Sequence, residues 1–178
     1  MTVAADLVVV GGGPVGLATA IAARAEGLSV VLVEARRPPL DKACGEGVMP
    51  AGVAALEALG VEPAALGQRF TGIRYVAGGH RVAADFPRGA EGRGVRRTEL
   101  HAALAARAER VGVDLRWGVA AHGLSAGGVE TSGGELRARW VAGADGLRSK
   151  VRRWAGLGLP ARGVERFGVR RHLRRAPG

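Results

Sequence analysis

The sequence has little cysteine, little aromatic character and no long hydrophobic run. Cys44 is the only cysteine among 178 residues, which excludes a disulfide framework and a cysteine-rich metal site. Aromatic residues make up only 4% of the chain, so alanine, valine, leucine and glycine must fill its interior. No apolar run approaches the roughly 20 residues of a membrane span, and residues 1–6 carry no export signal. The sequence therefore predicts a cytoplasmic protein with no membrane span.

Histidine is also sparse and scattered. His80, His101, His122 and His172 lie far apart and show no metal-ligand spacing, so we expect surface or hydrogen-bonded histidines and no metal site. The lone cysteine also argues against the flavin disulfide reductases, which need a redox pair of cysteines.

Acidic residues are scarce at the carboxyl end, which explains the net charge of +10. Residues 1–147 hold 16 Lys and Arg against 15 Asp and Glu, whereas residues 148–178 hold 10 against one. Such a basic stretch could bind phosphates. However, it contains only Trp154 and Phe167 as aromatics and no recognisable nucleic-acid module. We therefore expect a solvated or packing surface there and no nucleic-acid partner.

Glycine is abundant, and near the amino end it forms a specific pattern. The apolar run Leu7–Val10 leads into Gly11-Gly12-Gly13-Pro14-Val15-Gly16, which matches G-x-G-x-x-G. An alanine-rich helical stretch continues to Glu26, and a second apolar run, Val30–Val33, ends in Glu34. Strand, glycine turn, helix, strand and acid together form the βαβ dinucleotide-binding fingerprint.

Each residue type in this turn has a physical purpose. Gly11 allows a tight turn, Gly13 lets the backbone approach a diphosphate, and Gly16 lets the helix pack against the sheet. Pro14 and Val15 open the helix, whose unpaired N–H groups attract phosphate. The turn therefore predicts a diphosphate site, with a ligand-free glycine loop as the alternative.

Glu34 refines this prediction. Its carboxylate can accept two hydrogen bonds from an adenosine ribose, whereas a 2′-phosphate would be repelled there. The sequence therefore predicts FAD or NAD in this site rather than NADP.

The rest of the chain predicts a nucleotide domain interrupted by a second sheet. An irregular stretch over 35–49 precedes a helix over 50–59, and Gly78-Gly79 joins two strands into a hairpin. Further expected elements are strands over 70–76, 81–86, 114–117, 120–125, 127–131, 136–142 and 165–173, and helices over 98–111 and 148–155.

A second motif follows the strand that ends at Ala142: Gly143-Ala144-Asp145-Gly146-x-x-Ser149-x-Val151-Arg152. An aspartate at such a strand-to-helix turn can hold backbone N–H groups or polar atoms of a cofactor. An Asp-Gly turn that only caps a helix is the alternative.

The two motifs, in this order and at this separation, resemble the FAD-dependent monooxygenases built like para-hydroxybenzoate hydroxylase. Geranylgeranyl-reductase-like and halogenase-like flavoproteins are similar. The resemblance implies a Rossmann-like α/β FAD-binding domain with an inserted antiparallel hairpin and a β-meander. It also implies that Gly11, Gly13, Gly16 and Glu34 bind the ADP half of FAD.

The resemblance assigns further cofactor-binding residues. Arg97 begins an R-x-x-L pattern that lies near the ribityl and phosphate portion of FAD, and Asp145-Gly146 is implicated in binding both FAD and NAD(P)H. Lys42, Cys44 and Gly45 belong to a segment that resembles the flavin-side loop of the reductase-like members. Lys42 or Arg36 could meet the diphosphate, while Cys44 is most simply a small residue in a tight loop.

The family is considerably longer, and its G-D-A motif does not occur after Asp145. The resemblance therefore implies an N-terminal part: residues 1–158 form the FAD-binding domain, and residues 159–178 begin a substrate domain that is largely missing. The hairpin over about 69–87 would belong to the substrate side.

By resemblance, NAD(P)H reduces the flavin, which then oxygenates a small organic substrate or, in the reductase branch, saturates a double bond. The sequence assigns no catalytic residue.

Two other functions stay open. One is a non-catalytic FAD-binding remnant or subunit that needs a partner chain. The other is a short NAD-dependent dehydrogenase, which is disfavoured because the only tyrosine, Tyr75, forms no Tyr-x-x-x-Lys pair.

Overall fold

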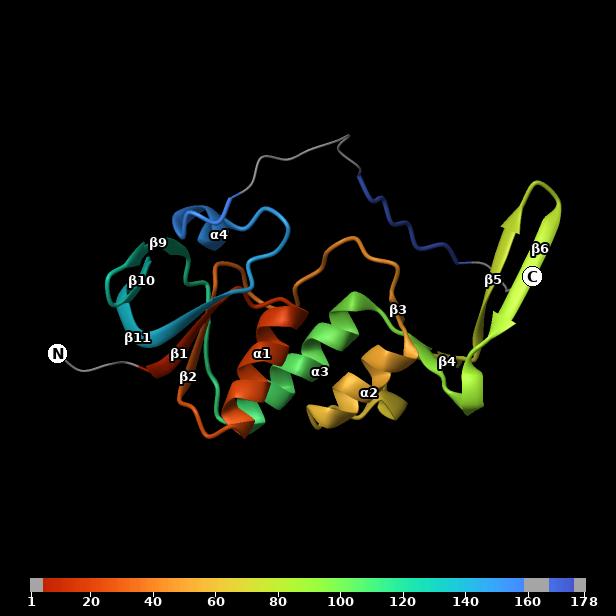
Figure 1. Cartoon of the computed structure of the whole chain (residues 1–178), viewed down its shortest axis with the longest axis horizontal. Helices are drawn as coiled ribbons and strands as arrows, with labels where there is room; N and C mark the ends of the chain where they lie inside the picture. The colour runs from red at the N-terminus through yellow and green to blue at the C-terminus, as the bar shows by residue number, and fades with distance from the viewer. Residues whose placement is uncertain (1–4, 159–166, 175–178) are drawn as a thin grey trace.

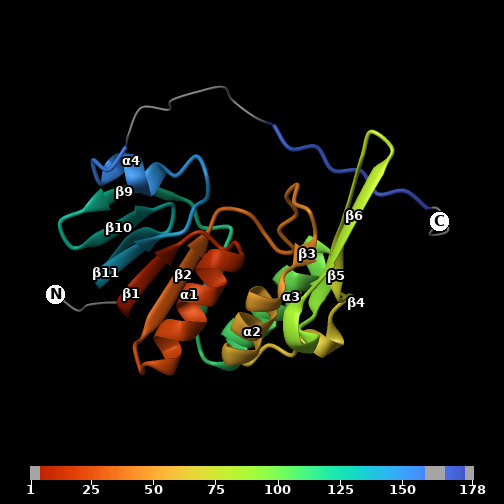
Figure 2. The ribbon, with the colours of Figure 1, turned by 45° about the vertical axis from the view of Figure 1, so that its right-hand side comes forward.

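The computed structural model describes residues 5–158 and 167–174, and its largest sheet has six strands, which lie toward the left side of Figures 1 and 2. Four neighbouring strands run parallel, and the sheet continues beyond the fourth as an antiparallel meander. This arrangement confirms the Rossmann-like α/β prediction. In spatial order the strands are β8 (Asp114–Trp117), β2 (Val30–Glu34), β1 (Ala5–Val10), β11 (Gly134–Gly143), β10 (Gly128–Thr131) and β9 (Ala121–Ser125).

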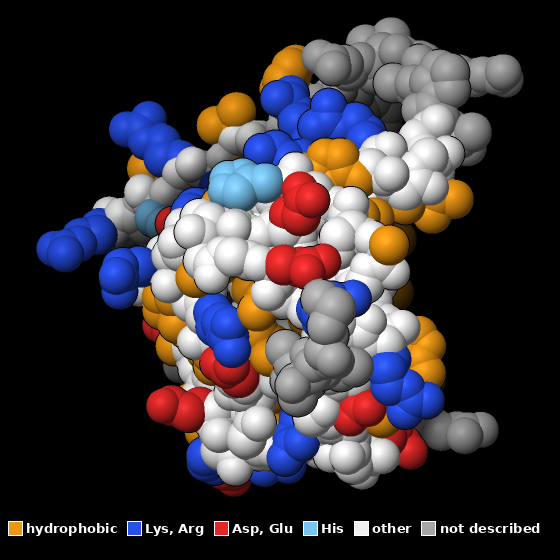
Figure 3. Space-filling model, turned by 90° about the vertical axis from the view of Figure 1, so that its left-hand side faces the viewer, with side chains coloured by type: hydrophobic (Ala, Val, Ile, Leu, Met, Phe, Trp, Pro, Cys, Tyr) orange, Lys and Arg blue, Asp and Glu red, His pale blue; other side chains and the backbone are white. Residues whose placement is uncertain are grey.

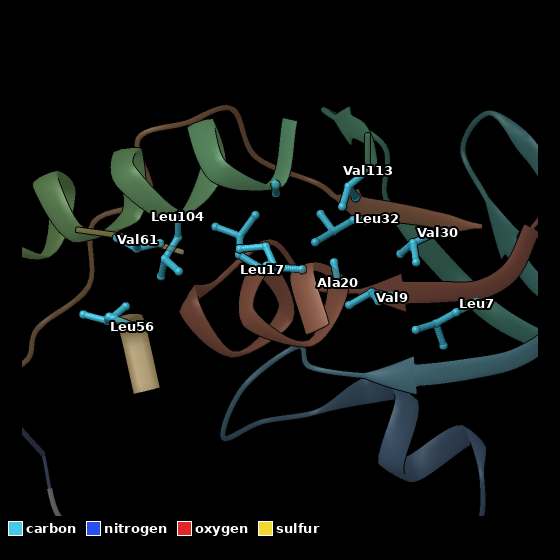
Figure 4. Close-up of a cluster of buried hydrophobic side chains, with 12 residues drawn as sticks. Leu7, Val9, Leu17, Ala20, Val30, Leu32, Leu56, Val61, Leu104 and Val113 are labelled. Atoms are coloured by element: carbon cyan, nitrogen blue, oxygen red, sulfur yellow. The ribbon is translucent and has the colours of Figure 1, made fainter. Parts of the chain in front are cut away.

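The central strands are apolar on both faces because both faces are covered. On one face, Leu7 and Val9 pack against helices α1 (Pro14–Ala25) and α3 (Arg97–Arg110), and Figure 4 shows this core. Helix α2 (Pro50–Ala58) adds Val53 and Leu56 to the buried residues. On the other face, Val8 and Val10 belong to a cluster with Val151 of helix α4 (Lys150–Trp154). Each fully buried valine or leucine contributes about 1.5–3 kcal/mol.

The predicted hairpin is confirmed. Strands β5 (Gly72–Ala77) and β6 (His80–Asp85) pair only with each other. Gly78 and Gly79 have φ of 53° and 80°, as a type I′ turn requires. In Figures 1 and 2 the hairpin stands clear of the six-stranded sheet.

The stretch over 35–49, which we expected to be irregular, ends in a strand, and two further short strands also lie mostly outside the expected elements. β3 (Gly47–Val48), β7 (Gly92–Gly94) and β4 (Gln68–Phe70) form a small antiparallel sheet. Short 3₁₀ turns precede β4 and β7, at Pro63–Ala65 and Pro87–Gly89. Strands of two or three residues are too short to show an alternating pattern, so periodicity does not predict them.

The expected final strand over 165–173 is wrong where it can be tested. Its first two positions lie outside the described residues, and residues 167–174 have no regular secondary structure. The side chains of Arg170 and His172 contact Asp41 and Glu46 instead, so this segment is held by side-chain contacts rather than by a strand ladder. Within the two described ranges, no helix combines the length and apolarity needed to cross a membrane.

Candidate dinucleotide-binding site

The glycine turn joins β1 to α1, and its three motif glycines have different surroundings. Gly11 has φ of +113°, and a Cβ there would lie 2.5 Å from the carbonyl oxygen of Ala144. A Cβ on Gly16 would overlap the carbonyl oxygen of Gly11. A Cβ on Gly13 would meet no atom within 4 Å. Packing within the protein therefore requires glycine at 11 and 16, whereas Gly13 borders open space that a ligand can approach.

The start of α1 is arranged for an anion. Pro14 occupies the first turn, no side chain caps Gly13, and Val15 is 69% exposed. The backbone N–H groups of the first turn therefore have no side-chain cap, and they form the positive end of the helix dipole.

Glu34 ends β2 next to this turn, and its side chain is only 13% exposed. One carboxylate oxygen accepts the N–H of Gly12 at 3.0 Å. The other accepts the N–H of Arg36 at 3.0 Å and lies 3.4 Å from its Nε. These contacts fix the carboxylate beside the glycine turn.

The Asp145-Gly146 turn lies directly beside the glycine turn. The N–H of Ala144 donates to the carbonyl of Val10 at 2.8 Å, which extends the contact of β1 with β11. One oxygen of Asp145 accepts the N–H groups of Lys150 and Val151, at 2.6 and 3.2 Å. Its other oxygen, Oδ1, is buried without a partner within the described chain. Asp145 therefore holds the first turn of α4 through one oxygen, while its other oxygen has no hydrogen-bond partner in the described chain.

Burial raises the pKa of Asp145, but hydrogen bonds from Ser149 and from the backbone of Val151 and Lys150 outweigh it, so the net pKa is lowered. A carboxyl group whose pKa is lowered in the folded state stabilises the fold at pH values above its ordinary pKa. This stabilisation is lost as the pH falls through the pKa of the folded state.

Replacing Asp145 by asparagine should therefore lower the free energy of unfolding by about 1 kcal/mol at neutral pH, because a neutral amide oxygen accepts these N–H bonds more weakly than a carboxylate. The difference from the native chain should shrink at about pH 3, which urea unfolding at both pH values measures. Asp85→Asn, on the exposed hairpin, is the control. An equal loss at both pH values would contradict a role for the charge.

A cavity of about 290 Å³ opens at the carboxyl ends of β1 and β2. Parallel sheets bind their ligands at this edge. Of the predicted residues, Gly11, Glu34, Arg36 and Asp145 line it. Other lining residues belong to no motif recognised in the sequence, and they come from the segment that leads into β9 and from α4 with the residues before it: Val119, Ala120, Ala121, Arg148, Lys150 and Trp154.

The basic residues that precede and form α4 lie beside this cavity. Arg148, Lys150, Arg152 and Arg153 are all exposed. Figure 3 shows Lys and Arg side chains gathered near the top of one face, at the height of α4 in Figure 1. Part of the excess positive charge therefore lies close to the predicted phosphate site.

The predicted flavin-side loop meets the start of α3 through Glu46, which the sequence analysis did not assign. Its Oε1 accepts the backbone N–H of Arg97 at 3.2 Å and lies 2.9 Å from Nη1 of Arg170. His172 hydrogen-bonds to its other oxygen, and this bond lowers the pKa of Glu46 against the effect of burial.

The other predicted residues of this loop lie around that junction. Lys42 and Gly45 are exposed, and Cys44 is a half-buried free thiol. A Cβ on Gly146 would lie 3.8 Å from Nζ of Lys42, so the loop also borders the second motif. The Nε of Arg97 is buried without a partner in the described chain.

His101 belongs to no motif in the sequence, yet it contacts the glycine turn. This histidine of α3 is completely buried, and its Nε2 lies 2.9 Å from the carbonyl oxygen of Gly12.

Among the described residues, no group of three or more His, Cys, Asp or Glu side chains is placed to hold a metal ion.

Fold and site together define a dinucleotide-binding α/β domain. Open space at Gly13 and the partnerless donor Nε of Arg97 fit the diphosphate of a bound cofactor. A family model described as "FAD binding domain" matches residues 4–173. The chain belongs to this FAD-binding family.

Named relatives are reductases and monooxygenases. Menaquinone reductase of Mycobacterium tuberculosis is 35% identical over 84% of this chain and 41% of its own length. Digeranylgeranylglycerophospholipid reductase of Methanothrix thermoacetophila is 35% identical over 85% of this chain and 42% of its own length. The structure of p-nitrophenol 4-monooxygenase from Pseudomonas putida matches with a TM-score of 0.77 and 26% identity, over 88% of this chain and 44% of that one. The chain thus spans about two fifths of the length of these proteins.

Proposed function

We propose that the chain is the FAD-binding part of a flavin-dependent oxidoreductase of the monooxygenase type, which NAD(P)H reduces and which acts on a small organic substrate. The main observation that supports this proposal is the contact between the two motifs. Gly11 packs on Ala144 there, and Gly13 faces open space. Family membership and the named relatives support the same reading.

In this proposal the start of α1, with Gly13, Pro14 and Val15, binds the diphosphate. Arg97 and Lys42 add positive charge to it, and Glu34 binds the adenosine ribose. Asp145 and Gly146 approach the cofactor from the second motif. When bound, FAD supplies two-electron redox chemistry, and the task of these residues is to bind and orient it.

A second candidate is saturation of a double bond in an isoprenoid chain. The specific observation in its favour is that the two reductases named above match this chain at 35% identity. Lys42, Cys44 and Gly45 would then belong to a loop that passes the flavin.

We also propose how the domain works within a larger unit. Residues 1–158 form the FAD-binding domain, the hairpin over about 69–87 faces the substrate side, and residues 159–178 begin the substrate domain. The hairpin's isolation from the main sheet and the greater length of the relatives support this division. Catalysis would then need further polypeptide, in the same chain or in a partner chain, and we propose the cytoplasm as its location.

Absorbance of the purified chain tests this proposal. We expect flavin bands between about 350 and 500 nm, and bleaching after addition of NADH or NADPH without oxygen. In the longer protein or complex that the proposal implies, oxygen uptake with a trial phenol would favour the monooxygenase, whereas oxygen-independent reduction of a menaquinone would favour the reductase. A chain that cannot be loaded with FAD would overturn both candidates, and a yellow chain that NAD(P)H leaves unreduced would support a non-catalytic subunit.

A further inference from the structure

Both polar groups of Gly12 are held inside the protein. Its N–H donates to Glu34 at 3.0 Å, and its carbonyl oxygen lies 2.9 Å from Nε2 of His101. Because a carbonyl oxygen can only accept, Nε2 must carry the proton of the imidazole ring.

His101 is locked in this role by its surroundings. Its side chain is completely buried, and its ring centroid lies 5.7 Å from that of Trp117. Its Nδ1 is buried without a partner in the described part of the chain, so a second ring proton would be left unpaired. Burial accordingly lowers the pKa of His101.

Because the peptide bond is planar, the contact between His101 and the Gly12 carbonyl also fixes the direction of the Gly13 N–H. In a trans peptide the carbonyl of one residue and the N–H of the next point in opposite directions. Holding the Gly12 carbonyl against α3 therefore directs the N–H of Gly13 away from α3. The space around Gly13 is open on the side where a side chain would stand.

We propose that His101 is a positioning residue for the cofactor diphosphate, because it holds the Gly12–Gly13 peptide with its N–H toward the phosphates. The inference rests on the proposed diphosphate site. Two successive glycines rotate at low cost, so without His101 this peptide can flip and present a carbonyl oxygen to the phosphates. The sequence pattern supplies the flexible turn, and a histidine from another helix supplies its orientation.

A pair of substitutions separates this role from simple packing. His101→Leu keeps the bulk and removes the donor, whereas His101→Gln places an amide N–H at the level of Nε2. Titration of the chain with FAD, followed by flavin fluorescence, should show a Kd about tenfold higher for His101→Leu, in line with a lost hydrogen bond to a buried carbonyl. His101→Gln should return the Kd to within about threefold of the native value. His122→Leu, at an exposed position of β9, is the control.

The phosphate-free ligand adenosine supplies the decisive comparison. Competition against FAD should show the same penalty of His101→Leu for ADP and none for adenosine. A penalty for all three ligands, or a His101→Gln variant as weak as His101→Leu, would show a structural role only and overturn the inference. If the native chain binds FAD and His101→Leu binds it equally well, the inference fails while the proposed function stands. If the native chain binds neither FAD nor ADP, the proposed function itself fails.

Discussion

Gly11→Ala should lower the free energy of unfolding by about 3 kcal/mol, which combines backbone strain at positive φ with overpacking. Gly11 has φ of +113°, and its new methyl group would lie 2.5 Å from the oxygen of Ala144 and 2.8 Å from the nitrogen of Asp145. Neither contact can relax by rotating a side chain, because both neighbours are backbone atoms. Chemical unfolding of the FAD-free chain measures this loss.

Gly13→Ala is the matched control, two residues away in the same turn. Its φ of −71° suits any residue, and its methyl group meets no protein atom within 4 Å. We therefore expect stability within about 0.5 kcal/mol of the native chain, together with weaker FAD binding because the methyl group occupies the ligand's approach. Equal destabilisation by the two variants would contradict the division of this turn into a packed and an open part.

Glu34→Arg should weaken FAD retention by about 1–3 kcal/mol, which corresponds to a Kd about 5- to 150-fold higher. The native carboxylate holds the N–H of Gly12 and the backbone of Arg36, and in the proposed complex it also accepts the ribose hydroxyl groups. A guanidinium can do neither, and it adds a second cation beside Arg36. The ratio of bound flavin to protein after gel filtration gives a first reading, and fluorescence titration gives the Kd.

Glu57→Arg is the control for charge, because Glu57 is exposed on α2. It makes the same change in net charge away from the cavity and should leave the Kd unchanged. If Glu34→Arg also leaves the Kd unchanged, Glu34 does not bind the ribose.

The sequence predicted those parts of the site whose residues interact locally. Strand, turn, helix and acid follow one another between Leu7 and Glu34, and each residue type carries its own physical reason. Parallel strands such as β2 could also be predicted from the sequence, because a strand buried on both faces is a continuous apolar run such as Val30–Val33.

The remaining parts of the site depend on contacts across the fold. His101 looks like one more residue beside the apolar stripe of its helix, and its partner Gly12 is 89 positions away. Glu46 accepts from Arg97, 51 positions further on. Neither spacing follows from helical or strand periodicity, so only the folded arrangement reveals them.

The packing of Gly11 against the Ala144–Asp145 peptide has a consequence for biosynthesis. The glycine turn follows β1, whereas the strand that shapes it, β11, is made more than 120 residues later. During synthesis the turn can therefore take its final form only after β11 has inserted beside β1. In the proposed function, binding of the cofactor diphosphate would then depend on this strand pairing.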